Sequence, residues 1–111
     1  MGNIARMALS DGNNRVYVSY FSFFEMTIKA SIGKLSLNHS VISDLPQMGI
    51  EMVMPDVRAL QGYTIFNPGN KDPFDNMLIS VARIEKCTLV TSDAKILTVS
   101  VPGLKLLDAT V

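Results

Sequence analysis

Short apolar runs rich in strand-forming residues alternate along this chain with segments of helical periodicity. The runs are Arg15–Ser19, Ile50–Val53, Thr88–Thr91 and Leu104–Leu107. Strands separated by helices predict βαβ units with right-handed crossovers. We therefore expect an α/β fold of three layers with a mostly parallel sheet. The length of 111 residues suits one domain, 1–111, and the chain contains no internal repeat or dividing linker.

The helical segments differ in how clearly their ends are marked. The helix after the first strand contains Phe21, Phe24, Ile28, Ile32 and Leu35 at helical spacing, and Gly33 marks its expected end. The clearest helix opens at Asp72-Pro73-Phe74-Asp75 and has Leu78, Val81 and Ala82 on its apolar stripe. Weaker helical segments are predicted at Ile4–Leu9, at His39–Met48 and from Pro55 to Leu60, where Pro55 suits a first helical position.

Charge and cysteine content limit the possible functions. The chain has 10 basic and 10 acidic residues, so no overall positive field holds a polyanion, and any nucleic-acid binding must be local. Cys87 is the single cysteine and begins the apolar, strand-like run Cys-Thr-Leu-Val-Thr, which favours a buried thiol in a reducing compartment. No apolar run is long enough to cross a bilayer, and the first residues lack a secretory h-region. We expect a cytoplasmic protein.

Three acidic residues are expected at one edge of the predicted sheet. Glu25 follows the first strand, Asp75 lies in the first turn of the clearest helix, and Asp93 comes just after the strand that ends at Thr91. In parallel α/β sheets, the carboxyl ends of strands and the first turns of helices meet at the edge where ligands bind. Glu25, Asp75 and Asp93 are therefore candidate members of one site.

Each acid also has a structural explanation. Glu25 is expected at the third position of a capping box with Ser22, and Asp75 occupies the equivalent position behind Asp72. Asp93 can initiate a turn from Ala94 to Leu97. Clustered carboxylates repel each other unless a cation neutralises them, and oxygen ligands suit Mg²⁺ or Mn²⁺ better than zinc.

Three segments together resemble a known family. They are Val18-Ser-Tyr-Phe-Ser-Phe-Phe-Glu-Met-Thr-Ile-Lys-Ala-Ser-Ile-Gly-Lys-Leu35, Lys71-Asp-Pro-Phe-Asp-Asn-Met-Leu-Ile-Ser-Val-Ala82 and Leu89-Val-Thr-Ser-Asp93. In this order, with strands between them, they are similar to the later acidic motifs of PIN-domain ribonucleases of the VapC toxin type. The resemblance runs from about Ala5 to about Leu107.

The resemblance implies a metal-dependent endoribonuclease whose site is blocked by a small antitoxin protein, and it implies a homodimer. Glu25, Asp75 and Asp93 correspond to the second, third and fourth acids, which hold Mg²⁺ or Mn²⁺, and Thr91 corresponds to a supporting hydroxyl. Lys71 is expected either to contact the RNA backbone or to be solvated. For Lys29, a helical salt bridge with Glu25 is preferred.

The sequence departs from the family pattern at its beginning. Family members start with a central strand ending in Asp-Thr, whose Asp is the first metal ligand, and no residue here takes that role; Asp11 is no substitute. Without that strand, the runs at Val16 and Thr88 would each keep an unsatisfied edge. Three explanations compete: the chain is a truncated toxin, it is a decayed fragment, or the two edges pair directly or through another subunit. A truncated toxin is preferred. We expect weak RNA cleavage or none from this chain as written.

Three other classes of function compete with a ribonuclease. A non-catalytic module that binds an antitoxin or a dimer partner is the main alternative. A nucleotide-binding domain lacks support because no Gly-rich phosphate loop is present, and a serine or cysteine hydrolase lacks support because His39 is the only imidazole.

Overall fold

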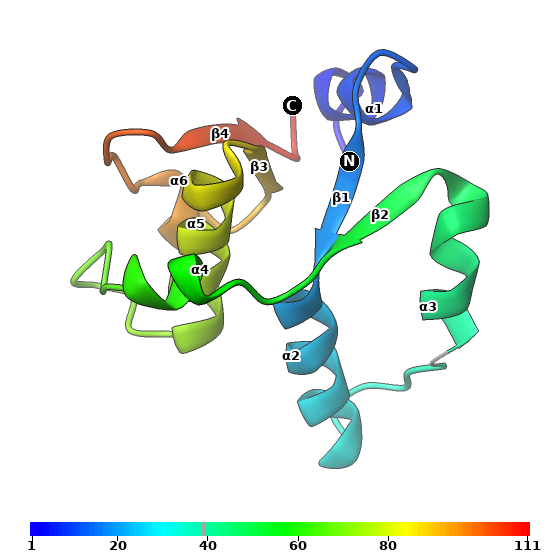
Figure 1. Ribbon diagram of the computed structural model, residues 1–111, viewed down its shortest axis with the longest axis horizontal. Coiled ribbons are helices and arrows are strands. Elements are labelled where there is room, and N and C mark those ends of the chain that lie inside the picture. The colour runs from blue at the N-terminus through cyan, green and yellow to red at the C-terminus, as the bar shows by residue number, and fades with distance from the viewer. Residues whose placement is uncertain (39) are drawn as a thin grey trace. The chain divides into compact units, whose positions relative to one another are not determined.

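Two pairs of parallel strands form the sheets of the computed structural model, which describes residues 1–38 and 40–111 (Figure 1). The chain divides into two compact units. Residues 15–55 form one, and residues 1–14 together with 56–111 form the other. The expected α/β fold with parallel pairing is confirmed, but the described strands lie in two separate two-stranded sheets rather than in one sheet.

The unit of residues 15–55 is built on β1 (Val16–Ser19) and β2 (Ile50–Val53). The strands pair in parallel from Val16↔Ile50 to Ser19↔Val53. Between them come α2 (Tyr20–Ser31), α3 (Ser40–Asp44) and the 3-10 helix η1 (Leu45–Met48). The predicted helix His39–Met48 is thus divided at Leu45, next to Pro46, whose ring lacks the donor that an α-helix needs; His39 itself lies outside the described residues.

The beginning of α2 corrects one expectation from the sequence. The predicted capping box of Ser22 and Glu25 is wrong, because α2 begins at Tyr20 and its N-cap is Ser19. Ser19 Oγ accepts a hydrogen bond from the Phe21 amide at 3.1 Å. The helix therefore starts directly at the strand end, and both Ser22 and Glu25 lie inside it.

The second unit contains α1 (Asn3–Ser10), α4 (Val57–Gln61), α5 (Pro73–Glu85), β3 (Thr88–Thr91), α6 (Ala94–Leu97) and β4 (Lys105–Asp108). Its core gathers around Ile79, Ile96 and Val99. Partly buried apolar side chains pack against this core: Phe66, Leu89, Val101, Leu104 and Leu106. The amphipathic face of α5 thereby fixes the helix beside β3 and α6.

Two element boundaries in this unit differ from the predicted ones. Pro55 does not open α4, because Asp56 is its N-cap and accepts a hydrogen bond from the Arg58 amide at 2.8 Å. A carboxylate cap satisfies a free helix donor, whereas proline merely tolerates the first position. The last strand is β4, Lys105–Asp108, one residue later than predicted.

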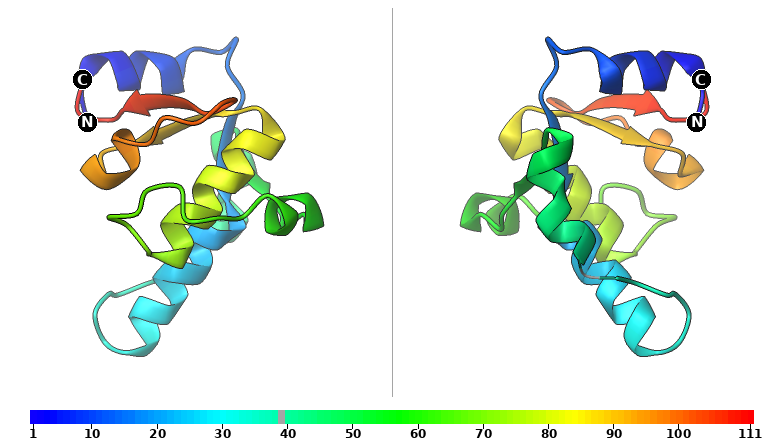
Figure 2. Two further views of the ribbon diagram at one scale, coloured as in Figure 1. Left: turned by 90° about the vertical axis from the view of Figure 1, so that its left-hand side faces the viewer. Right: turned by 90° about the vertical axis from the view of Figure 1, so that its right-hand side faces the viewer.

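The chain ends are held together within this unit. The Gly2 amide donates to the Ala109 carbonyl at 2.9 Å, and the Ile4 amide donates to the Val111 carbonyl at 2.7 Å. Both views of Figure 2 show the two termini side by side next to α1. A Cβ atom at position 2 would collide with the Val111 backbone, so this close approach requires glycine.

No helix in residues 1–38 or 40–111 is long and apolar enough to cross a membrane.

Candidate functional site

Asp75 lies in the first turn of α5, where its carboxyl group is partly buried. Asn70 Nδ2 donates a hydrogen bond to Asp75 Oδ2 at 2.9 Å. Burial raises the pKa of the Asp75 carboxyl, and the charges of Asp72 and Asp93 raise this pKa further, while the Asn70 hydrogen bond and Lys95 oppose the rise. An ionised Asp75 is thus in an environment that a nearby cation would improve.

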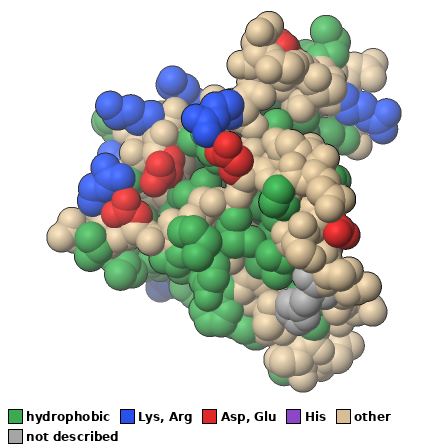
Figure 3. Space-filling model, turned by 45° about the vertical axis from the view of Figure 1, so that its right-hand side comes forward, with side chains coloured by type: hydrophobic (Ala, Val, Ile, Leu, Met, Phe, Trp, Pro, Cys, Tyr) green, Lys and Arg blue, Asp and Glu red, His purple; other side chains and the backbone are tan. Residues whose placement is uncertain are grey.

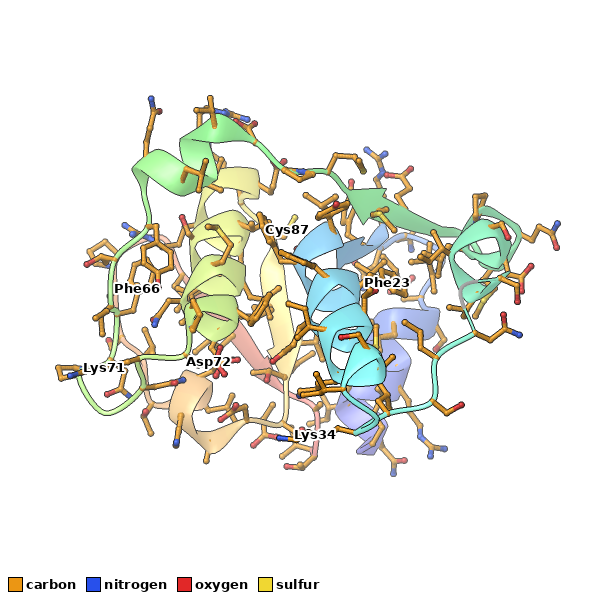
Figure 4. All side chains as sticks on the ribbon, turned by 90° about the horizontal axis from the view of Figure 1, so that it is seen from below. Phe23, Lys34, Phe66, Lys71, Asp72 and Cys87 are labelled. Carbon is orange, nitrogen blue, oxygen red and sulfur yellow. The ribbon has the colours of Figure 1, made fainter. Side chains whose placement is uncertain are left out.

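Asp72 precedes Asp75 and caps α5. Its Oδ1 accepts hydrogen bonds from the Phe74 amide at 2.9 Å and from the Asp75 amide at 3.4 Å. The predicted cap, with Pro73 in the first turn, is confirmed. Figure 4 shows Asp72 at the beginning of α5 and the side chain of Lys71 extending away from it. The contact of Lys71 with RNA stays a prediction.

Asp93 and Thr91 lie where β3 ends and α6 begins. Asp93 is the N-cap of α6, and its Oδ1 accepts a hydrogen bond from the Lys95 amide at 2.8 Å, so the predicted turn from Ala94 to Leu97 is confirmed. Thr91 Oγ1 accepts a hydrogen bond from the Asp93 amide at 3.1 Å. The Thr91 hydroxyl therefore helps to hold the backbone of Asp93 and keeps its own proton for donation.

Glu25 belongs to the other unit, residues 15–55, in α2. Its Oε2 lies 3.6 Å from Lys29 Nζ, which confirms the helical salt bridge preferred for Lys29. Within the unit that contains α5, Asp75 is near enough to Asp72 and Asp93 for their charges to affect its pKa. Glu25 is assigned to the site on the motif pattern alone.

Two buried asparagines beside Asp75, Asn70 and Asn76, are not among the residues that the sequence predicts for the site. Asn70 has 6% of its surface exposed and Asn76 has 1%. An asparagine in a loop usually reads as a turn residue, and its burial depends on tertiary packing that a local pattern does not carry. The feature of the sequence that points to both asparagines is their position within five residues of Asp75.

The donor chemistry of these acids fits a hard divalent cation, because carboxylate oxygens are the ligands that Mg²⁺ and Mn²⁺ prefer. The described part of the chain contains no group of three acidic, cysteine or histidine side chains arranged to hold a metal ion. The fit therefore rests on Asp75 and Asp93 as donors and on the raised pKa of Asp75.

Basic and acidic side chains are mixed on the face shown in Figure 3, where Lys or Arg groups lie next to Asp or Glu groups. Neither sign forms a broad single-charge patch on that face, in keeping with the formal net charge of +0.

Comparison with known families decides how this arrangement is interpreted. The model of the PIN domain family matches residues 2–101, which is most of the chain. The chain belongs to the PIN-domain family. PIN domains are generally nuclease domains that act on RNA and use divalent metal ions, and they are common in toxin-antitoxin systems. A search of curated proteins found no match.

Proposed function

We propose that this PIN domain is a metal-dependent endoribonuclease of the VapC toxin type, with Glu25, Asp75 and Asp93 as ligands of Mg²⁺ or Mn²⁺. The observation that carries the proposal is the partly buried Asp75 carboxyl, whose pKa is raised by burial and by neighbouring acids in a chain of a nuclease family. Such an arrangement favours cation binding, because a divalent ion offsets both the burial and the repulsion.

The chain's own residues would divide the work between holding and positioning. Asp75 and Asp93 supply carboxylate oxygens from the beginning of α5 and the end of β3, and Glu25 supplies another from α2. Thr91 fixes the backbone of Asp93 through the 3.1 Å hydrogen bond. When bound, the metal lowers the pKa of a coordinated water and offsets charge on the attacked phosphate.

In this proposal, the substrate of the protein is RNA, and its partners are an antitoxin protein and a second copy of the chain. No residue among the 111 matches the first acid of the family pattern, so cleavage by this chain alone is expected to be weak or absent. Equal metal-dependent cleavage by this chain and by a version carrying an upstream Asp-bearing strand would contradict that expectation.

Calorimetric titration with Mn²⁺ tests the metal site without requiring cleavage. Wild type should bind Mn²⁺, and Asp93→Asn should weaken binding by at least about tenfold, because the neutral amide loses the ligand charge. Asparagine still accepts the hydrogen bond from the Lys95 amide, so the cap of α6 survives the change.

Asp44→Asn is the matched control, because it removes one carboxylate in the other unit, outside the motifs. Its Mn²⁺ affinity should equal that of wild type. Absence of Mn²⁺ binding in wild type would overturn the proposal and favour the alternative, a non-catalytic PIN module that binds an antitoxin or a dimer partner.

A further inference from the structure

Asn70 is a buried amide between two acidic residues of the α5 N-terminus, with 6% of its surface exposed. Its Oδ1 accepts a hydrogen bond from the Asp72 amide at 3.1 Å, and its Nδ2 donates to Asp75 Oδ2 at 2.9 Å. A backbone N–H can only donate and a carboxylate can only accept. Only one orientation of the Asn70 amide therefore satisfies both neighbours.

The backbone around Asn70 is fixed as firmly as its side chain. Asn76, 1% exposed on the first turns of α5, donates through Nδ2 to the carbonyls of Asn70 at 3.1 Å and Asp72 at 3.0 Å. Its Oδ1 accepts from the Phe66 amide at 3.1 Å. The backbone N–H of Asn70 also donates a hydrogen bond to the Asn67 carbonyl at 2.8 Å. Asn70 therefore presents its donor from a rigid support.

We propose that Asn70 is a positioning residue that holds the Asp75 carboxylate in one orientation before any cation arrives. Its relevance to metal binding rests on the proposed function. A ligand that is already oriented loses less conformational freedom on binding, and residues that orient metal ligands typically affect metal affinity by about 10- to 100-fold. A purely structural role would instead fix the loop and leave the Asp75 side chain unaffected.

The first arm of the test measures Asp75 itself in metal-free protein. Three-bond couplings from the Asp75 backbone to its side-chain carboxyl carbon report how many χ1 rotamers are populated. In wild type, with a chelator present, these couplings should have the extreme values of a single rotamer. In Asn70→Ala they should move to averaged values.

Asn70→Asp keeps the acceptor for the Asp72 amide and removes the donor to Asp75, so it separates the two roles of Asn70. Because it retains the contact with the loop backbone, it also serves as the test variant if Asn70→Ala fails to fold. Averaged Asp75 couplings are expected here too. The control is Asn67→Ala, which removes side-chain bonds to the Gly69 amide and the Lys95 carbonyl without removing a bond to an acid. It should leave the Asp75 couplings at their wild-type values.

The second arm compares Mn²⁺ affinity by calorimetry. Asn70→Ala should bind Mn²⁺ at least about tenfold more weakly than wild type, while Asn67→Ala should stay within about threefold. Asn70→Asp is left out of this arm, because its new carboxylate can itself bind the ion.

The two arms of the test separate the positioning role of Asn70 from the proposed metal-binding function. Unchanged single-rotamer couplings in Asn70→Asp and Asn70→Ala would overturn the positioning role, whatever Mn²⁺ does. No Mn²⁺ binding in wild type would overturn the proposed function, and the couplings would then decide the positioning role by themselves. Averaged couplings together with the tenfold loss support both.

Discussion

Asp75 experiences two opposing influences on its charge. Burial and the negative charges of Asp72 and Asp93 raise the pKa of its carboxyl, whereas the Asn70 hydrogen bond and the charge of Lys95 lower that pKa. Without a cation, ionisation of Asp75 therefore opposes folding. Residues that serve a binding site commonly reduce the stability of the fold that carries them.

This balance predicts that Asp75→Asn stabilises the metal-free protein. Asparagine removes the buried charge and still accepts the hydrogen bond from Asn70. At pH 7 with a chelator, the melting temperature should rise by about 2 °C for a chain of this size. The change is measurable by thermal denaturation followed by circular dichroism.

The stability difference between Asp75→Asn and wild type should depend on pH in a defined direction. Because the pKa of Asp75 in the folded state is raised above its value in the unfolded state, protonation of Asp75 stabilises the fold at low pH. This stabilisation is lost as the pH rises through the folded-state pKa. The advantage of Asp75→Asn should accordingly shrink on acidification, as the Asp75 carboxyl of the wild-type protein becomes protonated. An advantage that grows on acidification would contradict the account.

At the scale of elements, the hydrogen bonds that begin the helices also place the candidate site residues. Asp72 begins α5, Asp93 begins α6, and Ser19 begins α2 directly after β1. A polar side chain at the N-cap satisfies amides that have no partner within the helix. The same bonds therefore set where the first turn of α5 presents Asp75 and where the N-cap of α6 presents Asp93.

Removal of the α5 cap should cost measurable stability. Asp72→Ala leaves the amides of Phe74 and Asp75 without their side-chain acceptor, and the expected loss is about 1 kcal/mol, or roughly 4–8 °C in melting temperature. Asp72→Asn is the control, because asparagine caps helices about as well as aspartate. Equal melting temperatures for Asp72→Ala and Asp72→Asn would show that the cap contributes nothing.

The sequence predicted most of these elements because their signals are local. Short apolar runs of strand-forming residues marked the strands, and Asp72-Pro73 marked the beginning of α5. The starts of α2 and α4 were predicted wrongly, because Ser22 looks as suitable a cap as Ser19 and because Pro55 suits a first helical position, whereas Ser19 and Asp56 are the caps. The burial of Asn70 could not be predicted, since it depends on loop packing against α5 rather than on any periodic pattern.

At the scale of the whole chain, the strands divide between two sheets that the sequence had placed in one. β1 pairs with β2 and β3 pairs with β4, and in the described residues neither sheet has a third strand. Local pattern predicts strands and parallel pairing but not which strands become neighbours, because that depends on long-range contacts. The three proposed ligands are correspondingly divided, with Glu25 in residues 15–55 and with Asp75 and Asp93 in the other unit.

The central proposal is that Glu25, Asp75 and Asp93 are ligands of a divalent ion, and paramagnetic line broadening tests this proposal most directly. Mn²⁺ added below one equivalent to ¹⁵N-labelled protein broadens amide signals near the ion. We predict simultaneous loss of the signals around all three acids, restored by Mg²⁺ in excess and absent in Asp93→Asn. Broadening that spares Glu25, or that spreads over exposed acids such as Glu51 instead, would contradict the account.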